Sequence, residues 1–188
     1  IESRLADDLD AHLNAEIALG TISDLDDVMD WLETTFYYQR AHADPETYDP
    51  EGLRERVRST LQDLVDRGFV TTDSDLAVEA TQLGRLASNY YLRLPTAVRF
   101  ADLVDRDRLS VDAVLDAVAR AEEFDSVSAR QDETDAIDEV LDGAATDLEN
   151  GHRKVLAILD ASMDDRVPSG LRSDAWVIRQ NALRLLGA

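Results

Sequence analysis

The feature that most constrains the fold is a change in the spacing of apolar residues between 69 and 80. Before this stretch, apolar residues recur at intervals of three and four, which is the spacing of one buried helical face. Over 69–72 and 76–80 they alternate with polar residues, which is the period of a half-buried strand. The polar residues 73–75 separate the two runs. The sequence therefore predicts a helical region interrupted by a β-hairpin.

Three helices are predicted before the hairpin and one after it. The second begins at a Ser23 cap and is expected to end near His42, ahead of a loop that contains two prolines. The predicted bounds are about 4–19, 23–42, 51–67 and 81–92. This order of three helices, a two-stranded wing and one helix is that of a winged-helix domain. Its end is predicted near Leu94, because the residue before a proline is disfavoured in helical geometry.

Gly84 lies in the first turn of the helix predicted over 81–92, behind the good N-cap residue Thr81. Glycine in a helix costs roughly 1 kcal/mol relative to alanine. A glycine is favoured at such a position, despite this cost, when another part of the backbone lies too close to leave room for a side chain. We therefore expect a neighbouring segment to pack directly against Gly84.

The second half of the chain is helical throughout. Predicted helices cover 95–104, 110–120, 129–141, 152–163 and 171–186, and the stretch 142–151 is the weakest segment and is expected to be a linker. The predicted fold class is mostly α, with a winged-helix domain over 1–94 followed by a small helical bundle over 95–188.

Composition limits the chemistry and the partners. The 188 residues include no cysteine, which excludes disulfides and thiolate metal sites. The net charge of −21 comes from 40 acidic against 19 basic residues. A self-repelling surface of this kind is tolerated in concentrated salt, which shortens the Debye length to about 3 Å at 1 M, so we interpret the acidity as adaptation to a saline solvent. No apolar run approaches the roughly 20 residues of a membrane span, so no membrane partner is expected.

Motifs for nucleotide or acyl chemistry are missing from the sequence. It contains no phosphate-binding loop, no dinucleotide-binding glycine turn and no nucleophile elbow. His12, His42 and His152 fall on different predicted elements at no metal-ligand spacing. For the chain itself we therefore expect no catalytic residue, no cofactor site and no metal site.

The last predicted helix carries the strongest candidate site. Trp176, Arg179, Gln180 and Arg184 lie beside its apolar stripe, and together they offer a ring that can stack on a base, two guanidiniums for phosphates and an amide. The alternative is an amphipathic helix whose tryptophan fills the core and whose arginines cover the rim. The negative charge of the chain favours this alternative, because nucleic-acid binders usually carry a basic surplus.

Four ordered motifs resemble a known family. They are residues 10–32 (DAHLNAEIALGTI, then DDVMDWL), 81–91 (TQLGRLASNYY), 123–133 (EFDSV with Arg130 and Glu133), and the pair 152–159 and 173–182. The region is similar to the C-terminal winged-helix and Sec-family helical (ratchet) part of superfamily 2 DExH-box helicases. The branch includes the archaeal repair, meiotic crossover and spliceosomal unwinding helicases.

The resemblance implies a place directly after two RecA-like motor domains of the same parent chain, which would bind ATP and Mg²⁺. It implies that the helix 171–186 lies across the path of a translocated single strand, with Trp176, Arg179, Gln180 and Arg184 as contacts. The chain departs from the family pattern at Val177 and Arg184, where the family often has a basic and an aromatic residue. We expect a cytoplasmic monomer from a halophilic archaeon. The alternative is a stand-alone winged-helix regulator or protein-interaction module.

Overall fold

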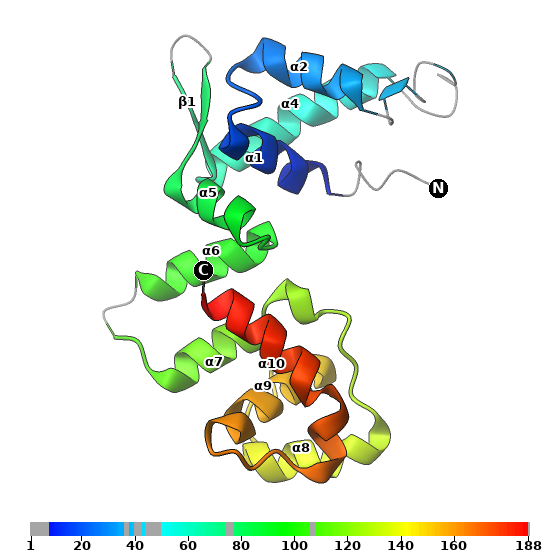
Figure 1. The fold of residues 1–188 in the computed structure, drawn as a ribbon, viewed down its shortest axis with the longest axis vertical. Coiled ribbons are helices and arrows are strands. Elements are labelled where there is room, and N and C mark those ends of the chain that lie inside the picture. Colours follow the sequence, from blue (N-terminus) through cyan, green and yellow to red (C-terminus); the bar gives the residue numbers. More distant parts are fainter. Residues whose placement is uncertain are drawn as a thin grey trace. The chain divides into compact units, whose positions relative to one another are not determined.

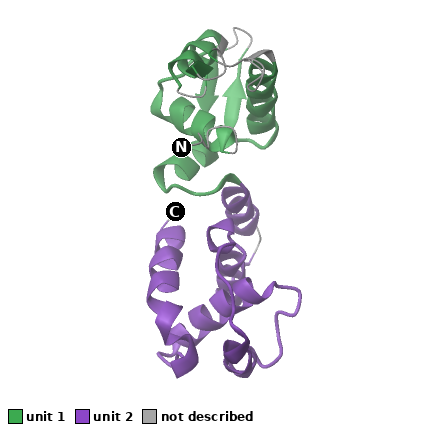
Figure 2. Ribbon diagram, turned by 90° about the vertical axis from the view of Figure 1, so that its right-hand side faces the viewer, with its two compact units in different colours: residues 1–94 green, residues 95–188 purple. Residues whose placement is uncertain are grey.

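The chain forms two compact units, Ile1–Leu94 and Pro95–Ala188, which are coloured separately in Figure 2. The computed structural model describes residues 8–35, 38–39, 43, 50–73, 77–105 and 108–187. Both units are mainly helical, and the first contains a two-stranded sheet (Figure 1). The predicted fold class, a winged helix followed by a helical region, is confirmed.

The helices and strands follow the predicted order. The first unit contains α1 (Leu9–Leu19), α2 (Leu25–Thr34), α4 (Pro50–Asp66), β1 (Val70–Thr72), β2 (Val78–Ala80) and α5 (Gln82–Asn89). The second contains α6 (Leu94–Val104), α7 (Val111–Ala119), α8 (Thr134–Leu141), α9 (Asn150–Met163) and α10 (Arg172–Leu186). Short 3₁₀ turns, η2 (Glu122–Phe124), η3 (Gln131–Glu133) and η4 (Ser169–Leu171), lie between these helices.

The wing is an antiparallel hairpin. Val70 pairs with Ala80 and Thr72 with Val78, and the turn residues 74–76 lie outside the described part of the chain. The wing is also attached to the segment before α2, because the Val78 backbone N–H donates to the carbonyl of Ser23 at 2.8 Å. The change of apolar period in the sequence therefore marks a real change from helix to strand.

Helix α2 differs from the prediction at both ends. Its N-cap is Asp24, whose side chain accepts from the Asp27 N–H at 2.9 Å, whereas Ser23 donates its own hydroxyl to the Asp27 carboxylate at 2.6 Å. The helix ends at Thr34, because Thr35 has extended backbone angles. The predicted end near His42 is therefore wrong for α2, and His42 itself lies outside the described residues.

Gly84 is the point at which α5 meets the rest of the winged helix. A Cβ added there would lie 2.2 Å from the carbonyl oxygen of Phe69 and 2.8 Å from Oδ1 of Asn14. The buried Asn14 of α1 donates through Nδ2 to the Gly84 carbonyl at 2.9 Å. Thr81 caps the helix by accepting from the Gly84 N–H, and its own backbone N–H donates to Phe69. The predicted close approach to Gly84 is confirmed.

Helix α9 is the centre of the second unit, since α7, α8 and α10 all pack against it (Figure 1). The predicted helix over 129–141 is a 3₁₀ turn, η3, followed by the shorter α8. The segment between α8 and α9 is a connection inside the unit: Leu148 is buried there, and Asp147 is paired with Arg120 of the α7 terminus. Thr96 of α6 donates to Glu123 near η2 at 2.7 Å.

Candidate nucleic-acid interface

One face of α10 anchors the helix in the second unit. Ala175, Ile178, Ala182 and Leu185 are buried on this face, at the spacing expected for a helix that covers a core. They pack toward α9 and α7. Ile178 is buried on this face, whereas its neighbour Val177 is exposed.

The opposite face of α10 is open. Trp176 is 69% exposed and Leu183 is 62% exposed, and Arg179 and Gln180 are also exposed. These four residues follow the i, i+3, i+4, i+7 spacing of neighbours on one helical surface. The alternative in which Trp176 fills the core is therefore wrong. Arg184 lies one turn beyond Gln180 and is half-buried.

This helix has a charge balance opposite to that of the chain. It contains three arginines and one aspartate, whereas the chain as a whole carries a net charge of −21. The single aspartate, Asp174, is held by Lys154 of α9. The outward face of α10 therefore combines exposed apolar side chains with guanidinium groups and has no carboxylate of its own.

A buried ionic cluster lies at the beginning of α10. Lys154 is 1% exposed, and its Nζ donates to both carboxylate oxygens of Glu133, at 2.9 and 2.8 Å, and to Asp174. It also donates to the Ser128 carbonyl at 3.3 Å. Arg130 donates to Glu133 through its backbone at 2.7 Å and through its guanidinium at 2.5 Å. Two cations and two carboxylates thus join α9, η3 and α10.

The cluster lowers the pKa values of its two carboxyl groups, Glu133 and Asp174. Burial by itself raises the pKa of Glu133, but the hydrogen bonds from Lys154 and from the Arg130 backbone outweigh this effect, so the pKa lies below its ordinary value. The hydrogen bond from Lys154 is the largest cause that lowers the pKa of Asp174. Both groups are therefore charged at neutral pH.

Sequence reasoning did not identify this cluster. The residues stand at 130, 133, 154 and 174, on elements that only the tertiary fold brings together. The one available signal was that Lys154 is the single lysine of the chain and lies among apolar residues of a predicted helix.

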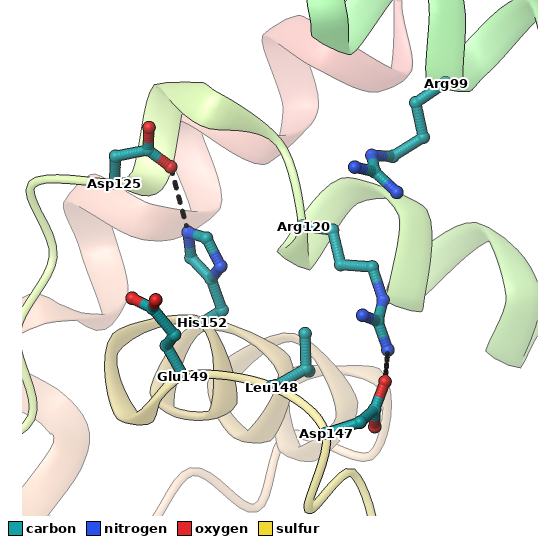
Figure 3. Close-up of a pocket in the computed structure, with 7 residues that line it drawn as sticks. All are labelled: Arg99, Arg120, Asp125, Asp147, Leu148, Glu149 and His152. Atoms are coloured by element: carbon teal, nitrogen blue, oxygen red, sulfur yellow. Dashed lines mark hydrogen bonds and ion pairs between the residues drawn. The ribbon is translucent and has the colours of Figure 1, made fainter.

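The second unit also contains a pocket of about 440 Å³ (Figure 3). It is lined by Arg99, Arg120, Asp125, Asp147, Leu148, Glu149 and His152. Arg120 donates to Asp147 at 2.5 Å, and His152 Nε2 lies 3.2 Å from Asp125 Oδ1 (Figure 3). Three carboxylates against two guanidiniums make this pocket a poor site for a phosphate.

Other kinds of site receive no support in the described part of the chain. No group of three or more His, Asp or Glu residues there has the arrangement of a metal site. His12 is exposed on α1. Across the same residues, every helix is too short or too polar to cross a membrane.

Two family models match the chain. Residues 80–188 match the Sec63 Brl domain, and residues 2–81 match a winged helix-turn-helix domain. The two matches meet near the start of α5, and the first of them covers α5 to α10.

Individual relatives are similar over nearly the whole chain. Activating signal cointegrator 1 complex subunit 3 of Rattus norvegicus is 30% identical over 208 residues, which cover 100% of this chain and 9% of that protein. The protein of the same name from Dictyostelium discoideum is 30% identical over 206 residues, with 99% and 9% covered. The DExH-box ATP-dependent RNA helicase DExH14 of Arabidopsis thaliana is 33% identical over 161 residues, with 81% and 7% covered. The chain thus spans about a tenth of the length of these relatives.

Proposed function

Because the chain belongs to the Sec63 Brl domain family and carries a winged helix-turn-helix domain before that domain, we propose that it is an accessory region of an ATP-dependent DExH-box helicase. The name of the Arabidopsis relative, a DExH-box ATP-dependent RNA helicase, supports this proposal. The parent chain is then a superfamily 2 helicase, and its RecA-like motor domains, outside this region, bind Mg²⁺ and hydrolyse ATP. The winged helix braces those motor domains.

The role we propose for the second unit is to guide the translocated single strand along α10. The observation that carries this proposal is the exposure of Trp176 beside Arg179 and Gln180 on one helical face. The indole offers a stacking surface that accepts any base, and the guanidiniums of Arg179 and Arg184 offer charge to phosphates. Such contacts hold a strand without reading its sequence.

The acidity of the chain fits a parent protein from a halophilic archaeon, which works as a monomer in the cytoplasm. At molar salt, repulsion between a surface rich in carboxylates and a phosphate backbone is screened within about 3 Å. Contacts to phosphate weaken under the same conditions, because salt reduces the gain from counterion release. We therefore propose that stacking on Trp176 supplies the larger share of the contact.

The test uses the protein that carries this chain, in high salt, with single-strand crosslinking and unwinding as readouts. Trp176→Ala is expected to lower affinity on the order of tenfold, as for the loss of one base-stacking contact. Arg179→Ala is expected to lower it less, and its effect should shrink as salt is raised. Arg108→Ala, at an exposed position of the second unit outside α10, is the matched control. Unchanged crosslinking and unwinding in both α10 variants would refute the proposal.

A stand-alone winged-helix regulator is the second candidate. Its support is a group of exposed arginines on α4, the third helix of the winged fold. Two of them are already paired with acids, since Arg54 lies 3.8 Å from Glu33 and Arg58 lies 2.9 Å from Glu55. The coding sequence upstream of Ile1 distinguishes the two candidate functions. The helicase proposal requires a phosphate-binding loop and a DExH box in that upstream sequence, and the regulator does not.

A further inference from the structure

The buried ionic cluster is attached to the first turn of α10, close to the proposed stacking residue. Asp174 is the third residue of the helix, and Trp176 follows two positions later. Ser173, the residue before Asp174, is also engaged, because the Arg130 guanidinium donates to its hydroxyl at 3.5 Å. Both contacts come from the same four-residue cluster, so the cluster fixes two of the first three residues of the helix.

Apolar packing alone gives this end of α10 little rotational definition. Between the buried Leu171 and Ile178, the core face of α10 carries Ala175, which has no rotatable side chain to interlock with a neighbouring helix. Cap geometry does not define it either, since Leu171 provides no side-chain hydrogen bond to the helix. Hydrophobic contact is non-directional, whereas a charge-assisted hydrogen bond has a preferred length and direction.

We infer that Lys154 and Asp174 are positioning residues, which set the rotation of α10 and thereby the direction in which Trp176 is presented to a nucleic-acid strand. The inference rests on the proposed function of α10. Lys154 is suited to this role because Glu133, itself 1% exposed, holds its ammonium group from the opposite side. A base-stacking ring depends on orientation, since the face of the ring and not its edge must meet the base.

The variant to test this is Asp174→Ala. Lys154 is fully buried, so its replacement threatens the fold, but the Asp174 side chain is 39% exposed and its removal leaves the bond between Lys154 and Glu133 in place. The matched control is Asp160→Ala, which removes the same charge from an exposed position on α9. Thermal unfolding of each variant sets a temperature at which both remain folded.

The sign of the change in strand affinity separates positioning from general electrostatics. Removing a carboxylate from an acidic protein should tighten binding to a nucleic acid, and this is the result expected for Asp160→Ala. Loss of positioning should weaken binding of a labelled oligothymidylate by Asp174→Ala by at least about twofold, the lower bound of coupling between contacting residues. In a Trp176→Ala background the same substitution should cause no weakening.

A second readout needs no nucleic acid. In a Trp31→Phe background, the indole N–H resonance of Trp176 should shift or broaden in Asp174→Ala and stay unchanged in Asp160→Ala. Binding by Asp174→Ala that is as tight as wild type, while Trp176→Ala binds weakly, would overturn the inference and leave the proposed function standing. If Trp176→Ala binds normally, the proposed function fails, and an unchanged indole resonance in Asp174→Ala would then overturn the positioning role as well.

Discussion

Replacing Gly84 by alanine tests how closely the winged helix is packed. The added Cβ would lie 2.2 Å from the carbonyl oxygen of Phe69, about 1 Å inside an ordinary carbon–oxygen contact. The neighbour is backbone, and it cannot rotate away as a side chain can. Moving it would also disturb the bond from Thr81 N–H to Phe69, which is 2.9 Å long, and the bond from Asn14 to the Gly84 carbonyl.

The expected loss follows from these contacts. Overpacking costs about 1–3 kcal/mol, and each weakened hydrogen bond adds about 1 kcal/mol. Alanine returns about 1 kcal/mol through its better helix propensity. We therefore expect the free energy of unfolding of the first unit to fall by about 2–4 kcal/mol, a large part of the stability of a small domain.

The assay is urea unfolding followed by Trp31 fluorescence in a Trp176→Phe background, so that the signal comes from the first unit. Gln82→Ala is the control, because Gln82 is exposed on the same helix of the first unit and its replacement adds no atom to the core. The control should be neutral or slightly stabilising, since alanine has the better helix propensity. A Gly84→Ala protein as stable as its parent would refute the close-packing argument.

Three further predictions concern the second unit. Gly151→Ala should destabilise the second unit by about 1–3 kcal/mol, because the new Cβ would lie 2.0 Å from the Val127 carbonyl oxygen. Urea unfolding followed by Trp176 fluorescence measures the change, and an unchanged free energy of unfolding would contradict the prediction. Lys154→Met should cost about 3 kcal/mol, the lower end of the range for breaking a buried ion pair, since it leaves the buried Glu133 carboxylate with the exposed Arg130 guanidinium as its remaining cation. A Lys154→Met protein with an unchanged unfolding midpoint would show that the cluster adds no net stability. The lowered pKa values of Glu133 and Asp174 contribute stability that is fully present above the ordinary carboxyl pKa of about 4 and is lost as pH falls through the lowered values. Asp174→Ala should therefore lose less unfolding free energy than wild type between pH 5 and pH 2. Equal losses in the two proteins would exclude this linkage.

The order of elements in the first unit was predictable because each element has a local signal. Thr81 is a good N-cap residue, and the spacing of apolar residues changes at Phe69. Gly84 has a poor helix propensity, which indicated that a neighbouring backbone segment lies against it. The end of α2 was not predictable, because the apolar spacing continues through Phe36 and Tyr37, beyond the point at which the extended backbone of Thr35 stops the helix. The spacing of apolar residues indicates which side chains can be buried, but it does not indicate the residue at which the backbone leaves the helix.

The candidate site was only partly accessible from the sequence. The spacing placed Trp176 and Arg179 near one face of a helix, but a tryptophan beside an apolar stripe can lie on either side of the boundary. The tertiary fold decides this: α10 packs against α9 with Ile178 buried and Trp176 exposed. The roles proposed for these residues at a nucleic-acid strand stay predictions. The ionic cluster depends on contacts 20 or more residues apart, for which the sequence has no local pattern.

Because Lys154 is buried, the chemical reactivity of its amine can be used to measure local opening of the second unit. It is the one lysine in the sequence, and in the folded state its amine is covered by Glu133 and Asp174. A reagent that acylates amines can reach it only when α9 and α10 separate, so the rate at which this amine is acylated, followed by mass spectrometry, measures how often that part of the protein opens. Performed with and without a bound strand, the measurement would report on α10 without any introduced label.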